Sequence, residues 1–151
     1  MAKKIALKLD YQSPFTVFSI FSTQKDYRLA WLLNENLGFE LERIKDYTHL
    51  FSGTKSSWFP LFCFDYKQYR TLVILLGNKS AEGVIFDENP PPDYMLLLLR
   101  ASEFINQKEL LSKLRKIDQI QAVATPNEAV LKKHELFFYD LEHFLSEQAV
   151  V

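Results

Sequence analysis

Residues 15–22 constrain the fold more than any other segment. They predict a strand, and apolar side chains occupy both faces of this strand. Phe15 and Val17 fall on one side of an extended chain, and Phe18 and Ile20 fall on the other. Edge strands rarely carry this pattern. We therefore expect a central strand in a sheet that is covered on both faces.

Further elements follow from alternating apolar residues, from β-branched and aromatic content, and from apolar residues at helical spacing. Strands are predicted at residues 5–9, 39–46, 58–66, 71–76, 84–86, 93–100 and 120–125. Helices are predicted at residues 24–37, 107–117 and 127–146, although residues 136–139 would also suit a strand. Loops are predicted at residues 48–57 and 87–92.

The ends of the first two helices carry recognisable signals. Thr23 lies three residues before Asp26, and Asn106 lies three residues before Glu109, which is the spacing of an N-terminal cap. Gly38 supplies the left-handed residue that commonly ends a helix, so we expect the first helix to stop there.

The order of these elements predicts an α+β fold. Consecutive strands are joined by links too short for parallel crossovers, such as residues 67–70 between two strands of an antiparallel hairpin. We expect one globular domain over residues 1–151, with a largely antiparallel sheet of about six strands, two helices and a C-terminal helix.

Charge and cysteine content limit the classes of partner. The 18 Lys and Arg residues against 19 Asp and Glu give a net charge of -1, which argues against a nucleic-acid partner.

Cys63 is the only cysteine, so no intrachain disulfide can form, and no signal-peptide pattern precedes residue 15. The longest aliphatic run, residues 96–99, is far short of the roughly 20 residues of a membrane span. We expect a cytoplasmic protein with no membrane contact.

Three stretches of the chain, residues 25–31, 76–80 and 86–94, carry a family resemblance. In order and length, residues 5–137 resemble the IPExxxVDY family of small bacterial proteins, found mainly among Bacteroidota. Glu88, Asp93 and Tyr94 match the motif that names the family, and its Ile, Pro and Val are replaced by Phe86, Asp87 and Pro92. The resemblance implies a similar size and order of elements, and it brings no established activity.

Two interpretations of the motif residues stay open. In the structural one, prolines 90–92 hold an extended loop, Asp93 accepts amide hydrogen bonds at the end of a turn, and Tyr94 packs at the start of a strand. In the functional one, Glu88 and Asp93 are a carboxylate pair for general acid and base chemistry, which requires environments that separate their pKa values.

The histidines, the cysteine and the Gly-Asn turn are expected to have structural rather than catalytic roles. His49, His134 and His143 lie far apart without zinc-site spacing, so we expect structural or surface roles, no bound metal and no cofactor. Cys63, between two phenylalanines, is expected to be a small buried hydrophobe. Residues 77–80 are predicted as a hairpin tip rather than a phosphate loop, since Gly and Asn tolerate positive φ.

The aromatic residues suggest where a partner would bind. Most are expected in the core, but Trp31, Trp58 and Phe59 are candidates for a hydrophobic surface that binds a protein partner or a second copy of the chain. The first functional hypothesis is therefore a non-enzymatic interaction module. The alternative is a small-ligand binder or an enzyme that uses Glu88, Asp93 and Tyr94 beside an aromatic pocket.

Overall fold

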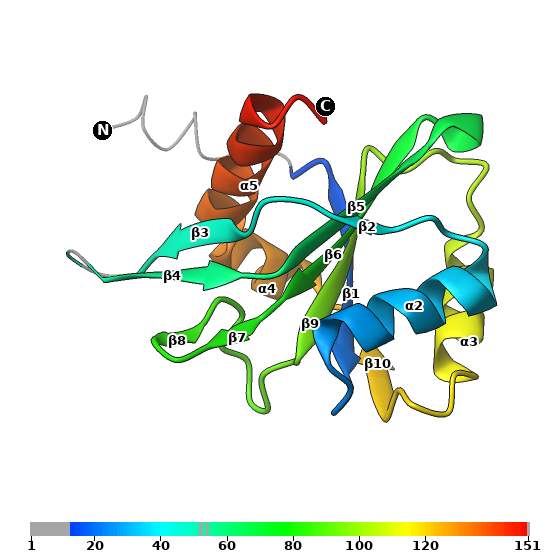
Figure 1. The fold of residues 1–151 in the computed structure, drawn as a ribbon, viewed down its shortest axis with the longest axis horizontal. Helices are drawn as coiled ribbons and strands as arrows, with labels where there is room; N and C mark the ends of the chain where they lie inside the picture. Colours follow the sequence, from blue (N-terminus) through cyan, green and yellow to red (C-terminus); the bar gives the residue numbers. More distant parts are fainter. Residues whose placement is uncertain (1–12, 52, 54, 151) are drawn as a thin grey trace.

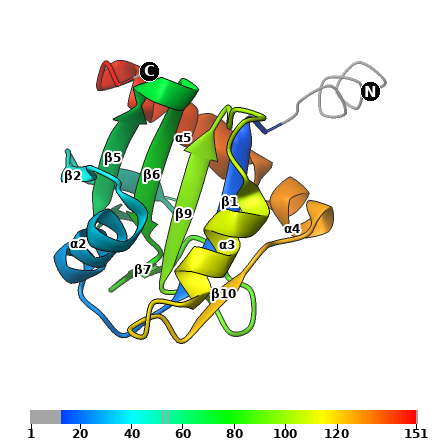
Figure 2. The ribbon, with the colours of Figure 1, turned by 90° about the vertical axis from the view of Figure 1, so that its right-hand side faces the viewer.

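The computed structural model describes residues 13–51, 53 and 55–150, and a six-stranded antiparallel sheet runs through them (Figures 1 and 2). The strand order is β10-β1-β9-β6-β5-β2. The strands are β1 (Phe15–Phe21), β2 (Glu42–Arg43), β5 (Leu61–Tyr66), β6 (Thr71–Gly77), β9 (Tyr94–Leu99) and β10 (Ala122–Ala124). The α+β prediction with a largely antiparallel sheet is confirmed. The strand predicted at residues 5–9 lies outside the described residues.

Strand β1 lies between β10 and β9, as its two apolar faces predicted. Val17 pairs with Leu97 and points into one core, whereas Phe18 pairs with Leu96 and points into the other. Because side chains alternate along a strand, each central strand contributes to both cores.

Two helices cover the first face of the sheet. Helix α2 (Asp26–Leu37) and helix α3 (Gln107–Arg115) lie side by side in front of the strands in Figure 2. Helix α2 buries Leu29 and Leu33, which recur at a spacing of four residues and therefore lie on one side of the helix.

The opposite face is covered by helix α5 (Glu135–Glu147) and by a separate hairpin of β3 (Tyr47–Leu50) and β4 (Ser56–Phe59) (Figure 1). The short helix α4 (Glu128–Lys133) precedes α5. A second small hairpin, β7 (Lys79–Ser80) and β8 (Gly83–Val84), lies at the lower left of Figure 1. The chain therefore forms three layers with one core on each side of the sheet.

The prediction of a loop at residues 48–57 is wrong, because the two ends of this segment pair with each other in the β3–β4 hairpin. Long-range ring contacts stabilise this hairpin: the Phe137 ring lies 5.7 Å from the Tyr47 ring and 6.2 Å from the His49 imidazole. The strand predicted at residues 58–66 is two strands, β4 and β5, divided at Pro60. Proline lacks the amide donor that a continuous ladder needs.

Other predicted boundaries are partly confirmed. Asn106 caps α3, since its side chain accepts a hydrogen bond from the Glu109 amide at 3.0 Å, and Gly38 ends α2 with φ of 71°. The Thr23 cap is wrong, because α2 begins after Lys25 and no described side chain caps it. The helix predicted at residues 127–146 is two helices that meet at His134, and the strand alternative for residues 136–139 is wrong.

Candidate functional site

The motif residues Asp93 and Tyr94 anchor the link between β1 and α2. The Ser22 amide donates to Asp93 Oδ2 at 2.9 Å, and Lys79 Nζ donates to Oδ1 at 2.7 Å. The Tyr94 hydroxyl donates to the Gln24 carbonyl at 2.5 Å, and burial raises the pKa of Tyr94 to about 12. Asp93 thus accepts the amide hydrogen bond that the structural interpretation predicted.

Glu88 has entirely different partners from Asp93. Its carboxylate contacts His134, whereas Asp93 contacts Lys79 and Ser22. A hollow of about 520 Å³ at the start of α2 is lined by Asp93 and Tyr94 but not by Glu88. Among the described residues, the two carboxylates therefore share no partner, whereas general acid and base chemistry on one substrate would need both of them beside the same reacting group.

Asn78 was predicted at an exposed hairpin tip, and the structure corrects this. Its side chain is fully buried: Nδ2 donates to the carbonyls of Phe86 at 2.9 Å and Pro92 at 2.7 Å, and Oδ1 accepts from the Phe86 amide at 2.6 Å. The turn itself falls at residues 81–82. A buried side-chain amide needs partners for its donors and its acceptor. Asn78 finds them at Phe86 and Pro92, and it therefore holds both ends of residues 86–92.

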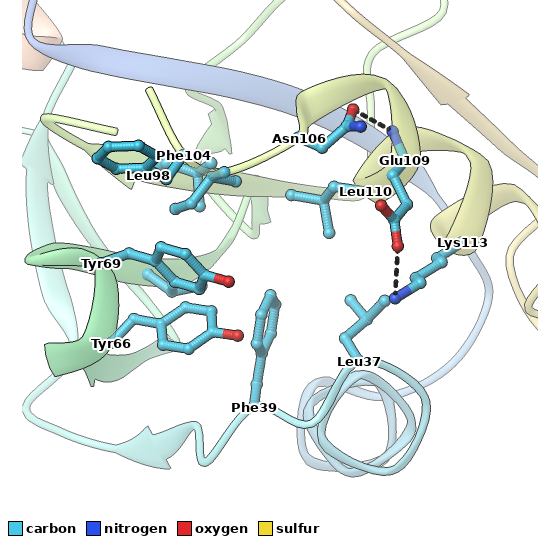
Figure 3. A pocket seen from close by; sticks show the side chains of 12 residues that line it. Leu37, Phe39, Tyr66, Tyr69, Leu98, Phe104, Asn106, Glu109, Leu110 and Lys113 are labelled. Atoms are coloured by element: carbon cyan, nitrogen blue, oxygen red, sulfur yellow. Dashed lines mark hydrogen bonds and ion pairs between the residues drawn. The ribbon is translucent and has the colours of Figure 1, made fainter. Parts of the chain in front are cut away.

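A pocket of about 160 Å³ opens on the α2–α3 face of the sheet (Figure 3). We call it the tyrosine pocket; it is lined by Leu37, Phe39, Tyr66, Tyr69, Val73, Leu98, Phe104, Ile105, Asn106, Glu109, Leu110 and Lys113. Phe39 and Tyr66 meet edge to face with ring centres 6.0 Å apart, and Tyr66 and Tyr69 meet at 4.7 Å. None of the motif residues Glu88, Asp93 and Tyr94 lines this pocket.

The tyrosine pocket has both apolar and polar walls. The hydroxyls of Tyr66 and Tyr69 point into the space shown in Figure 3 and make no hydrogen bond to any described residue. Glu109 and Lys113 form an ion pair of 3.1 Å at the wall of the pocket. Small-molecule sites commonly combine apolar and aromatic side chains with convergent polar groups, and this pocket contains both.

The candidate interaction aromatics lie in different environments. Phe59 is fully buried in the core on the α5 face, so its prediction as a surface residue is wrong. Alternation along β4 turns Trp58 outward and Phe59 inward. Trp58 is 64% exposed and Trp31 is 49% exposed, and Trp31 shares the outer face of α2 with Tyr27, which is 64% exposed.

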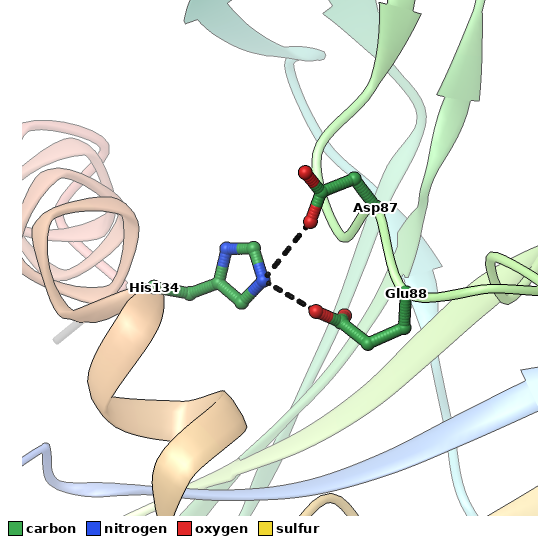
Figure 4. Close-up of side chains that lie close together, drawn as sticks. All are labelled: Asp87, Glu88 and His134. Atoms are coloured by element: carbon green, nitrogen blue, oxygen red, sulfur yellow. Dashed lines mark hydrogen bonds and ion pairs between the residues drawn. The ribbon is translucent and has the colours of Figure 1, made fainter.

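A second group of chemically active side chains forms where the motif segment meets the α4–α5 junction (Figure 4). His134 Nε2 lies 3.0 Å from Glu88 Oε2 and 3.7 Å from Asp87 Oδ1. We call Asp87, Glu88 and His134 the acid–histidine cluster. Sequence reasoning missed it because 46 residues separate Glu88 from His134. The only local signal was the pair of adjacent carboxylates.

Cys63 behaves as the sequence predicted. Its thiol is buried in the core on the α5 face, and burial raises its pKa to about 12, which keeps it protonated at neutral pH. In the described part of the chain, no helix is long and apolar enough to cross a bilayer.

Comparisons with known proteins bring no relative. No family model, no curated protein and no solved structure matches this chain. The resemblance to the IPExxxVDY family therefore stays a prediction that rests on the sequence, and function has to be argued from the geometry of the sites.

Proposed function

We propose that this protein is a non-enzymatic binding module that holds a small, ring-bearing molecule in the tyrosine pocket. The observation that carries the proposal is the pair of hydroxyls, on Tyr66 and Tyr69, that face a hollow of about 160 Å³ without a hydrogen-bond partner among the described residues. The aromatic and aliphatic part of the lining favours a ring, and the hydroxyls can orient a polar atom on it.

The volume of the pocket sets the size of the ligand. Apolar cavities of about 150 Å³ hold one benzene-sized molecule, so the tyrosine pocket accommodates a single ring. Small ligands gain at most about 1.5 kcal/mol per non-hydrogen atom and usually much less, so we expect weak binding, with Kd on the order of 10 μM to 1 mM.

The polar groups set the chemistry of the ligand. Phenol hydroxyls donate and accept hydrogen bonds, and Lys113, with a side chain 53% exposed, can turn from Glu109 toward an anionic group. We therefore expect a ring that carries a carboxylate or a hydroxyl to bind better than a ring that carries an amine.

Titration with benzoate, phenol and benzylamine, followed by amide chemical shifts in NMR, tests this proposal. Benzoate and phenol should shift amides at residues 66–69 and 104–110, and the double variant Tyr66→Phe/Tyr69→Phe should bind them at least about tenfold more weakly, because two hydrogen bonds are lost. Tyr27→Phe, outside the pocket, is the matched control. The proposal fails if these amides do not shift at millimolar ligand or if the double variant binds like the wild type.

A second candidate function is self-association through the outer face of α2. Tyr27 and Trp31 lie four residues apart and are largely exposed, and the Arg28 guanidinium stacks 4.6 Å above the Trp31 ring. This contact orders the indole in the free protein, which lowers the entropy that binding would cost. The net charge of -1 leaves little repulsion between copies.

Sedimentation equilibrium of the purified chain tests the second candidate. We expect a monomer–dimer equilibrium, and Trp31→Ala should weaken it at least about tenfold, as truncation of an interface tryptophan commonly costs 2 kcal/mol or more. Trp58→Ala removes an equally large exposed ring from a different face and should leave the equilibrium unchanged. A strict monomer at all concentrations, or equal effects of both variants, would contradict this role.

A further inference from the structure

We propose that the acid–histidine cluster, Asp87, Glu88 and His134, binds a divalent transition-metal ion, with Zn²⁺ the best match to its ligand set. This site lies apart from the tyrosine pocket and does not depend on the function proposed for it. Imidazole and carboxylate ligands together suit Zn²⁺ better than Mg²⁺ or Ca²⁺, which prefer oxygen atoms alone.

The spacing of the three groups fits such an ion. One ligand atom from each side chain lies within 4.8 Å of the other two, and His134 Nε2 is 3.0 Å from Glu88 and 3.7 Å from Asp87. Zn²⁺ bonds of about 2.0–2.2 Å place tetrahedral ligands about 3.3–3.6 Å apart. Small rotations of the half-exposed Asp87 side chain complete this geometry.

The cluster is held in place by the core. The His134 ring stacks on Phe86 with centres 4.3 Å apart and planes 13° apart, and its side chain is only 10% exposed. Phe86 is itself fully buried, and Asn78 bonds both its amide and its carbonyl. Because Asp87 and Glu88 directly follow this anchored residue, two of the ligands start from a fixed backbone.

One atom of the cluster lacks a partner in the described part of the chain. Glu88 Oε1 is buried and makes no hydrogen bond to any described residue, whereas Oε2 contacts His134. Burial of a carboxylate oxygen costs free energy unless a donor or a bound cation compensates for the lost water. A cation that Glu88 binds through both of its carboxylate oxygens would satisfy this atom.

Lys133 shows that the cluster attracts positive charge. Its ammonium lies 2.8 Å from Asp87 Oδ1 and 3.8 Å from Glu88 Oε2. The Lys133 side chain is 56% exposed and flexible, so it can leave when a dication replaces it.

Calorimetric titration of ZnCl₂ into the untagged, chelator-treated chain at neutral pH tests the proposal. We expect saturable one-to-one binding that His134→Gln and Glu88→Gln each weaken at least about tenfold, since loss of an outer-shell group alone commonly costs that much. Lys133→Met should tighten binding, because it removes the competing cation. His143→Gln, at an exposed histidine of α5, is the matched control and should bind like the wild type.

A spectroscopic readout separates ligation from a loss of folding. Co²⁺ bound in the same place should show visible d–d absorption that changes in shape with His134→Gln, while the far-ultraviolet circular dichroism of that variant stays that of the wild type. The proposal is overturned if no binding occurs up to about 500 μM Zn²⁺, a Kd range of negligible affinity. It is equally overturned if His134→Gln and Glu88→Gln bind as the wild type does.

Discussion

Replacing Asn78 with alanine is expected to lower the free energy of unfolding by about 3–6 kcal/mol, because three buried backbone groups lose their partners at about 1–3 kcal/mol each. These groups are the Phe86 amide and the carbonyls of Phe86 and Pro92, all within 3.0 Å of the Asn78 side chain. Asn78 is fully buried, so these groups do not reach bulk water. Denaturation in urea, followed by circular dichroism, measures the change.

Asn89→Ala serves as the control for this prediction, because it removes an exposed asparagine from the same loop. We expect that variant to stay within about 0.5 kcal/mol of the wild type. A loss below about 1 kcal/mol for Asn78→Ala would show that the three hydrogen bonds do not hold residues 86–92 in place.

Replacing Phe138 with alanine is expected to cost about 3–5 kcal/mol, the usual range for removal of a buried phenylalanine. The Phe138 ring is fully buried and packs against Phe15 of β1 at 5.6 Å and against Phe86 at 5.8 Å. It therefore joins helix α5 to both the sheet and the motif segment. The same urea titration should show a lower midpoint with an unchanged slope.

Leu136→Ala is the matched control on the same helix, since Leu136 is 71% exposed. Removing an exposed leucine leaves no cavity, so we expect a change within about 0.5 kcal/mol. Equal effects at Leu136 and Phe138 would mean that α5 does not dock on the sheet as described.

The predictable parts of the fold were those that local patterns determine. Apolar residues on both faces of β1 correctly predicted that this strand lies inside the sheet. The short polar link at residues 67–70 correctly predicted that the strands on either side of it are antiparallel. Asn106 and Gly38 marked helix ends because capping depends on neighbouring residues alone.

The parts that sequence reasoning missed depend on distant contacts. The β3–β4 hairpin is stabilised by ring contacts with Phe137, which no local window contains. Asn78 resembles a turn residue in its local sequence, because its three partners lie eight and fourteen residues away. The tyrosine pocket likewise combines residues from helices and strands that are far apart in the sequence.

The division of the molecule by its sheet has a consequence for the two proposed sites. The tyrosine pocket lies beside the core on the α2–α3 face, whereas Phe86, on which the His134 ring stacks, belongs to the core on the α5 face. Substitutions more than about 7–10 Å apart without shared partners usually add in their effects. Each side of the molecule can therefore acquire or lose a ligand without remodelling the other, and any communication between them must pass through the strands that both cores share.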